Sequence, residues 1–224
     1  MPISYLRWAV RKQGLFRVID QIAGRIAYLA LNKKKDQVIL NRLFDGEKID
    51  SVLNAWNGPL HVTSDYSAPE TVEWLRALQP DILVVHTSAW VGKRVRAIPA
   101  KGIVIGGHPG ITPYYRGAHS AFWAIHNNHP DDVGWSVFWL DEGVDTGDLI
   151  TQERIAIEPG DSYFTLGWKS MICIAEAQAR VIREFDSGRP IRRVPHDTIP
   201  PDSNFGVPTL REYLRYRRRQ KLCR

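Results

Sequence analysis

The stretch "DILVVHTSAWVGKRVRAIPAKGIVIGGHPG", residues 81–110, decides the fold class. It contains two continuous aliphatic runs, Ile82–Val85 and Gly102–Ile105, which are typical of strands covered on both faces. A helical segment precedes the first run and another segment separates the two, so helix and strand alternate along the chain. This alternation predicts an α/β fold with a mostly parallel sheet and with functional loops at the carboxyl ends of its strands.

The segment before this stretch is predicted to be largely helical. Apolar residues at helical spacing over residues 15–44 predict a helix in two pieces, broken near Asn32. A short strand is expected at 60–63. The next helix is predicted to begin at Ser67, because a serine before proline and glutamate is a helix-start signal.

Beyond residue 110 the sequence predicts more elements of both kinds. They are a helix at 120–127, strands at 134–140 and 149–157, a long helix capped by Asp161 that runs to about Phe185, and a basic terminal helix opened by Thr209 and Glu212. The two strands are antiparallel if the polar turn between them reverses the chain.

We divide the chain into three parts. Residues 1–50 form a helical basic N-terminal segment, residues 51–190 an α/β domain, and residues 191–224 a proline-rich crossing followed by a basic C-terminal helix. The first part lacks the buried strand and glycine turn that usually open such a domain. Either the chain begins inside a larger ancestral domain, or its sheet is smaller than normal.

The composition and charge of the chain limit the classes of protein to which it can belong. The 224 residues carry a formal net charge of +6, and the excess of lysine and arginine lies at the two ends of the chain. RNA binding is one hypothesis for this chain, and it rests on the charge alone. A solvated basic face explains the charge better. There is no apolar run of about 18 residues and no signal-peptide pattern, so we expect a cytoplasmic protein without a membrane partner. The two cysteines, Cys173 and Cys223, suggest neither a disulfide framework nor a metal site.

Two segments place titratable groups at the ends of predicted strands. His108 follows the second aliphatic run, and the turn "DEGVDTGD" occupies residues 141–148. A carboxylate that pairs with a histidine orients the imidazole and stabilises its protonated form, as a general acid/base requires. Glycines in the turn would let backbone approach a ligand closely. His126 and His129 have no third ligand nearby, so they are interpreted as solvated helix-end residues and no metal is expected.

Taken together, "HPGITPYYRGAHSAFWAI", residues 108–125, and "DEGVDTGDLI", residues 141–150, resemble the folate-dependent formyltransferase family, and most closely its sugar-nucleotide N-formyltransferases. The similarity is strongest from about residue 80 to 157 and looser from 60 to 185. It implies a three-layer, Rossmann-like fold. It also implies that an amine attacks the formyl carbon of 10-formyltetrahydrofolate, a cosubstrate, with no metal required.

The resemblance assigns catalytic positions in this chain. The family's histidine corresponds to His108 and its aspartate to Asp145, while its asparagine is replaced by Gly106. Losing one oxyanion donor typically lowers the rate by ~10²–10³, unless water, His119 or Ser120 fills the space. The resemblance further implies a cis peptide at Thr112-Pro113.

The resemblance also implies a slot for the pterin ring of the folate. One side of the slot is expected from Ser88, Ala89, Trp90 and Val91, and the other from Leu140, Asp141, Glu142 and Val144. Trp90 serves equally well as a packing residue.

The acceptor that fits best is a small-molecule amine, in the first place a sugar nucleotide. The glycine loop that holds a ribonucleotide phosphate in the purine-pathway enzyme is absent, and the residues after the last long helix are too few for a tRNA-binding barrel. A homodimer is compatible with the sequence. The alternative hypothesis is a catalytically impaired member of the same fold that binds folate, a nucleotide or a partner protein.

Overall fold

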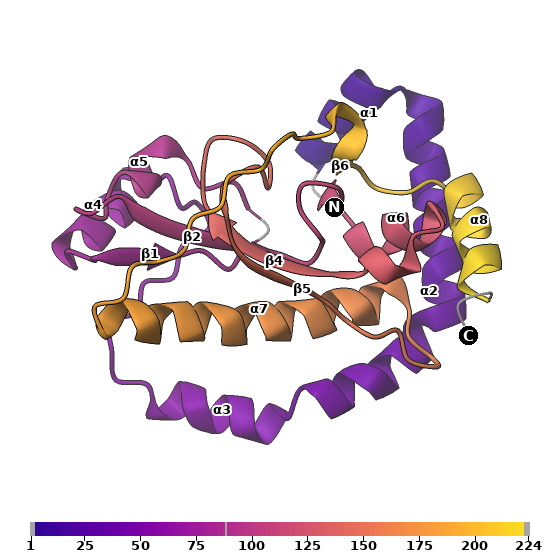
Figure 1. Ribbon diagram of the computed structural model, residues 1–224. Coiled ribbons are helices and arrows are strands. Elements are labelled where there is room, and N and C mark those ends of the chain that lie inside the picture. The colour runs from indigo at the N-terminus through magenta and orange to yellow at the C-terminus, as the bar shows by residue number, and fades with distance from the viewer. Residues whose placement is uncertain (1–2, 88, 222–224) are drawn as a thin grey trace.

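The computed structural model describes residues 3–87 and 89–221 and is drawn in Figure 1. The helices are α1 (Ile3–Gln13), α2 (Leu15–Leu43), α3 (Gly46–Ala55), α4 (Pro69–Ala77), α5 (Lys93–Arg96), α6 (Ser120–His126), α7 (Tyr163–Asp186) and α8 (Leu210–Gln220), with short 3₁₀ turns at Pro130–Asp132 and Pro201–Ser203. The strands are β1 (Ile82–Val84), β2 (Ile103–His108), β3 (Arg116–Gly117), β4 (Gly134–Trp139), β5 (Leu149–Arg154) and β6 (Asn204–Phe205).

The main sheet has the order β1-β2-β4-β5. Only β1 and β2 are parallel, whereas β4 is antiparallel to both β2 and β5. The expectation of a mostly parallel sheet was therefore wrong, although the α/β class and the antiparallel β4–β5 pair are confirmed. The short turn after β4 can only reverse the chain, but residues 109–133 between β2 and β4 are enough for a crossover in either direction, so the sequence does not determine how that pair is oriented.

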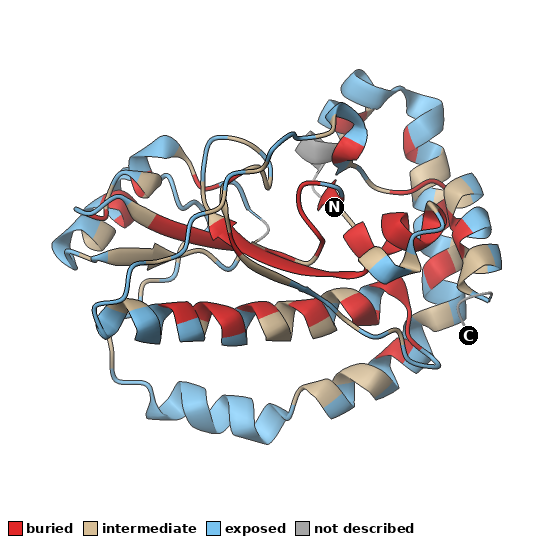
Figure 2. Cartoon of the chain, in the orientation of Figure 1, coloured by how far each residue is buried: buried red, intermediate tan, exposed pale blue. Residues whose placement is uncertain are grey.

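The helix α7 covers one face of this sheet. Ile105 and Val137 of the sheet and Ile174 of α7 belong to one buried cluster. Gly107 also faces α7, and a Cβ atom there would lie 2.2 Å from Cγ2 of Ile174, so the close packing requires glycine at this position. Figure 2 shows the row of buried residues along the side of α7 that faces the strands.

The opposite face of the sheet is covered in two parts. Near β1, a cluster built on Val72, Val91 and Val95 brings α4 and α5 against the strand. Near β4, the loop after β2 lies on the sheet and is held there by Ser136, whose hydroxyl donates to the Gly110 carbonyl at 2.8 Å and accepts from the Thr112 amide at 3.1 Å. The sheet thus lies between two layers, and His108, at the end of β2, bonds to Tyr115 and Ser120 of the second one.

A separate aromatic core joins α2, α6 and α8, which lie close together in Figure 1. It is built on Phe122, Tyr163, Tyr213 and Tyr216. The Tyr216 hydroxyl accepts from the Tyr163 amide at 3.0 Å, so α8 is joined to the start of α7. The capping box of Thr209 and Glu212 that starts α8 is confirmed.

Several local predictions were wrong in detail. The helix α2 continues through Asn32, because that side chain bonds within the structure, to the Tyr28 carbonyl and the Tyr213 hydroxyl. The strand predicted at residues 60–63 is not formed. The cap of α4 is Ala68 rather than Ser67, and that of α7 is Ser162 rather than Asp161.

No strand occurs within residues 3–81 of the described chain, as the sequence predicts for its first part. In place of a strand, this part contributes the long α2 and the short α3, which has no buried residue. A row of apolar side chains on α2 is exposed, and so is another on α3.

Candidate functional site

His108 is the last residue of β2, and both nitrogens of its ring have close polar neighbours. Nδ1 lies 3.2 Å from Oδ2 of Asp145, although 37 positions separate the two residues. Nε2 lies 2.8 Å from both the Tyr115 carbonyl and the Ser120 hydroxyl. The residue is 5% exposed, so its imidazole is fixed in the protein interior.

Asp145 reaches His108 because of the unusual backbone of its loop. Its φ is 52°, in the left-handed region that aspartate tolerates better than most residues. The same Oδ2 that faces His108 accepts a hydrogen bond from the Gly117 amide at 2.9 Å. The carboxylate therefore joins the loop after β2 to the loop after β4, and its side chain, 19% exposed, is the more accessible member of the pair.

The hydrogen-bond partners restrict where protons lie in this pair. The Tyr115 carbonyl can only accept, so Nε2 donates to it. On the other side of the ring, Nδ1 lies at ion-pair distance from the Asp145 carboxylate. The pair is therefore placed to exchange a proton with a reacting group.

Arg116 fixes the two loops relative to each other. This buried side chain donates from Nη1 to the Val144 carbonyl and from Nε to the Ser203 hydroxyl, each at 2.9 Å. The peptide bond Thr112-Pro113 is cis, as the resemblance implied.

Gly106 shares the face of β2 on which His108 lies, but the space beside it is filled. A Cβ atom at this position would lie 3.0 Å from Cδ1 of Leu140 and 3.3 Å from Cε2 of Phe138. Ser120 is engaged with Nε2 of His108 instead, and His119 lies elsewhere. The three atoms nearest the position of this Cβ belong to Leu140 and Phe138, and neither His119 nor Ser120 is among them.

The predicted pterin-slot residues separate into two groups. Trp90 and Val144 are exposed apolar side chains, whereas Val91 is buried in the cluster under α5. Leu140 packs against that cluster, Asp141 bonds within its own loop, and Ser88 lies outside the described residues. Val91 is therefore a core residue, which the apolar sequence around it did not distinguish from a slot residue.

Arg96 links the two sides of the slot, and sequence reasoning missed it. Its Nε donates to the Val91 carbonyl at 3.1 Å, and its guanidinium lies 3.7 Å from the Glu142 carboxylate. In the sequence Arg96 is one of several nearby basic residues, and nothing distinguishes it from Lys93 and Arg94, which are exposed in the structure.

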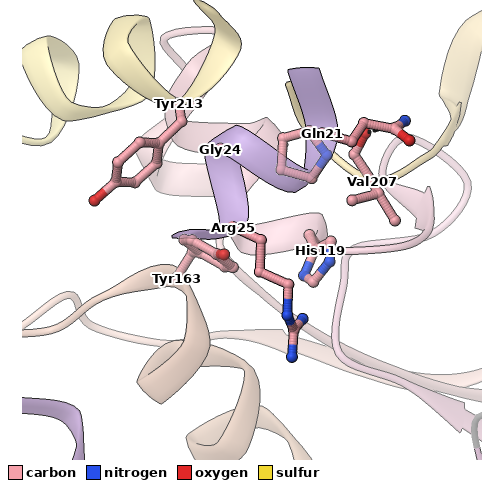
Figure 3. Close-up of a pocket in the computed structure, with 8 residues that line it drawn as sticks. Gln21, Gly24, Arg25, His119, Tyr163, Val207 and Tyr213 are labelled. Carbon is pink, nitrogen blue, oxygen red and sulfur yellow. Dashed lines mark hydrogen bonds between the residues drawn. The ribbon is translucent and has the colours of Figure 1, made fainter. Parts of the chain in front are cut away.

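His119 lines a small cavity of about 20 Å³ beside the catalytic loop, large enough for one water molecule. Figure 3 shows it among Gln21, Arg25 and Tyr163. Burial, and secondarily the charge of Arg25, lower the pKa of His119 below its ordinary value. His119 is therefore held in its neutral form next to Ser120.

Two other expectations for this region need correction. His126 is buried against Phe122 rather than solvated, and His129 accepts from or donates to the Tyr115 hydroxyl at 2.7 Å. The glycines of the 141–148 loop let its backbone pack closely against neighbouring residues. A Cβ atom on Gly143 would clash with the Thr146 side chain, and one on Gly147 with the Trp139 carbonyl. No ligand is needed to explain either glycine.

The fold and the paired histidine and aspartate define an α/β domain with a proton-transfer group at the end of a strand. A family model described as formyl transferase matches residues 19–171, and the chain belongs to this family.

The relatives are enzymes of several kinds. The GDP-perosamine N-formyltransferase of Brucella melitensis biotype 1 is 33% identical over 132 residues, covering 57% of this chain and 49% of the relative. The cytosolic 10-formyltetrahydrofolate dehydrogenase of Xenopus tropicalis is 32% identical over 134 residues, covering 54% and 14%. The chain therefore spans about half the length, or less, of these curated relatives.

The fold is also that of a solved sugar N-formyltransferase from Shewanella sp FDAARGOS_354. The TM-score is 0.52 with 15% sequence identity, and the match covers 88% of this chain and 82% of that one. The comparison supports the α/β, Rossmann-like class.

Proposed function

We propose that the protein transfers the formyl group of 10-formyltetrahydrofolate to an amine of a small molecule, and that this acceptor is a sugar nucleotide. The contact between His108 and Asp145 carries the proposal. Membership of the formyl transferase family supports the reaction class. The name of the GDP-perosamine N-formyltransferase supports the acceptor, and that of the 10-formyltetrahydrofolate dehydrogenase supports the donor.

In the proposed reaction the acceptor nitrogen forms a bond to the formyl carbon, and the bond from that carbon to N10 of the folate then breaks. The attacking amine must lose a proton and N10 must gain one. Asp145 is the accessible carboxylate beside the reaction centre, so it takes the proton from the amine. The Asp145–His108 pair then passes this proton to N10 as the bond to the formyl carbon breaks, and while His108 holds it the imidazolium supplies positive charge close to the developing oxyanion.

The two exposed apolar side chains of the slot fit a flat heterocycle. Trp90 precedes the buried Val91, and Val144 directly precedes the catalytic Asp145. Such side chains offer the apolar contact surface that a pterin ring needs.

The test is turnover of 10-formyltetrahydrofolate by the purified protein, with GDP-linked and UDP-linked amino sugars as acceptors. Asp145→Asn keeps the shape of the side chain but removes its basicity, so we expect the rate to fall by at least ~10². Asp148→Asn is the matched control, because Asp148 lies in the same loop but pairs with Arg193. Equal activity of the two variants would contradict the assignment of Asp145.

A second candidate function is a folate-binding protein with little catalysis. It is favoured by the filled space at Gly106, where the family's asparagine amide would lie, and by the internal bonds at both nitrogens of His108. Calorimetry with 5-formyltetrahydrofolate separates the candidates: binding without turnover supports the second, and failure of the folded protein to bind at millimolar ligand removes both.

A further inference from the structure

The helix α2 carries an exposed row of large apolar side chains, here called the apolar stripe. It consists of Leu15, Phe16, Ile19, Ile22, Ile26 and Leu29. Their spacing of three and four residues places them along one side of the helix. Phe16 is 89% exposed and Ile26 is 62% exposed, and at about 1.5 Å per residue the stripe is roughly 21 Å long.

The other side of α2 is the one that packs. Tyr28 is buried there and Gly24 lies against the start of α8, while Val18 is buried at the edge of the stripe. Figure 2 shows exposed residues on much of the upper part of α2. An apolar surface of this extent on a folded protein ordinarily marks an interaction site.

Cations lie at both ends of the apolar stripe. Arg11 and Lys12 lie in the last turn of α1, just before Leu15, and Lys33 and Lys34 follow Leu29 within α2. Lys33 lies about five helical turns after Leu15, so it continues the same side of the helix. Among residues 3–87 and 89–221, none of these four cations is within ion-pair distance of a carboxylate.

This part of α2 also carries Arg17, Asp20 and Arg25. Arg17 lies 3.9 Å from the Glu212 carboxylate of α8, and Arg25 lines the cavity beside His119. The six side chains of the stripe are themselves uncharged, and the partly buried Asp20 is the one carboxylate between Leu15 and Leu29.

We propose that the apolar stripe docks the protein on an anionic lipid membrane, with α2 lying parallel to the surface. In such a helix the apolar side inserts shallowly at the boundary between headgroups and acyl chains. The lysines and arginine at the ends are long enough to place their charges among anionic headgroups, which attract them. No helix within the described residues is long and apolar enough to cross a membrane.

Charge complementarity selects this occupant over a second copy of the chain. If two stripes paired in parallel, Lys33 and Lys34 of both copies would meet. If they paired antiparallel, these lysines would approach Arg11 and Lys12 of the other copy. Both arrangements bring like charges together, which disfavours association.

RNA is a poorer occupant for a related reason. Single strands are bound by cations along a groove with aromatic side chains between them. The centre of the stripe is aliphatic, and its cations lie only at the ends.

The test is sedimentation of the full chain with two kinds of vesicle, phosphatidylcholine alone and an equal mixture of phosphatidylcholine and phosphatidylserine. We expect binding to the mixed vesicles that weakens with salt. Phe16→Ser with Ile26→Ser should weaken it by at least about tenfold, because two apolar groups no longer insert. Lys33→Gln with Lys34→Gln should reduce the preference for phosphatidylserine.

The control is Leu60→Ser with Val62→Ser, which removes two equally apolar side chains that are 76% and 87% exposed outside α2. This variant should bind vesicles as the wild type does. Three results would overturn the proposal. The first is no vesicle binding by the folded wild type, and the second is an equal loss of vesicle binding in both double-serine variants. The third is that Phe16→Ser with Ile26→Ser abolishes self-association or RNA binding instead of vesicle binding.

Discussion

At the scale of single residues, the proposed reaction depends most on Gly106, which stands where the resembling family has an asparagine. Asparagine at this position would share the face of β2 with His108, and the strand backbone has no positive φ there to oppose it. The obstacle is Leu140, whose Cδ1 would lie 3.0 Å from the new Cβ. The sequence suggested the missing amide but not the leucine that fills its place.

We therefore expect Gly106→Asn to act only when Leu140 is shortened. With Leu140→Ala as background, Gly106→Asn should raise formyl transfer from 10-formyltetrahydrofolate at least about tenfold, because the amide supplies the lost donor. Leu140→Ala alone is the control. If the double variant folds and binds folate but its rate is unchanged, the site has diverged beyond this residue, and the folate-binding candidate becomes the better one.

His119 makes the stability of the fold depend on pH. Its pKa is lowered in the folded protein from an ordinary value of 6.5, so the unfolded chain takes up a proton more readily. The free energy of unfolding therefore falls as pH drops through 6.5 towards the folded-state pKa, and the contribution of His119 is unchanged at higher pH.

His119→Asn isolates this effect, because asparagine tolerates the φ of 58° at this position. Urea denaturation of the wild type and the variant at several values from about pH 8 to about pH 5 gives the comparison. The wild type should lose stability relative to the variant on the acid side. A difference that stays constant across this range would show that His119 is not held neutral.

At the scale of elements, two glycines inside helices have opposite packing. A Cβ atom on Gly24 of α2 would lie 2.9 Å from the backbone of Thr209 and Leu210, where α8 begins, whereas a Cβ on Gly167 of α7 meets nothing within 4 Å. Gly167→Ala should raise the free energy of unfolding by up to about 1 kcal/mol, because alanine is the better helix former. Gly24→Ala should lower it by roughly 1–2 kcal/mol, because rigid backbone must move apart. Thermal or urea unfolding of both variants measures the contrast, and a stabilising Gly24→Ala would mean that α2 and α8 do not cross so closely.

The elements also show what sequence patterns can and cannot predict. The box of Thr209 and Glu212 was predictable because capping is decided by residues three apart. The pairing of His108 with Asp145 was predictable from two motifs and their resemblance to one family. The apolar row on α2 predicted a helix correctly, but spacing alone does not say whether a row is packed, and this one is exposed. The prediction of mostly parallel strands failed for a similar reason. How two strands pair depends on how the chain connects them and not on the residues of the strands themselves.

At the scale of the whole molecule, two cores divide the work of holding the site. The sheet and α7 position His108 at the end of β2, and the aromatic core of α2, α6 and α8 positions Ser120, the first residue of α6. One test of RNA binding through the basic C-terminal helix is to delete α8. Because α8 supplies the buried Tyr213 and Tyr216 to the second core, that deletion also removes packing that the fold needs. Loss of affinity after such a deletion would report on folding as well as on charge. Substitutions of exposed arginines are the better test.

The packing of α8 against α6 has a consequence for how the protein is made. A ribosome releases α6 and the main sheet before it releases Leu210–Gln220, so the nascent chain holds Phe122 and Tyr163 without Tyr216, which packs on both rings. Every residue that touches His108 has been synthesised by then. Co-translational assembly of the site is thus finished by a helix that contributes no group to it, and until then the exposed aromatic surface is a target for chaperones.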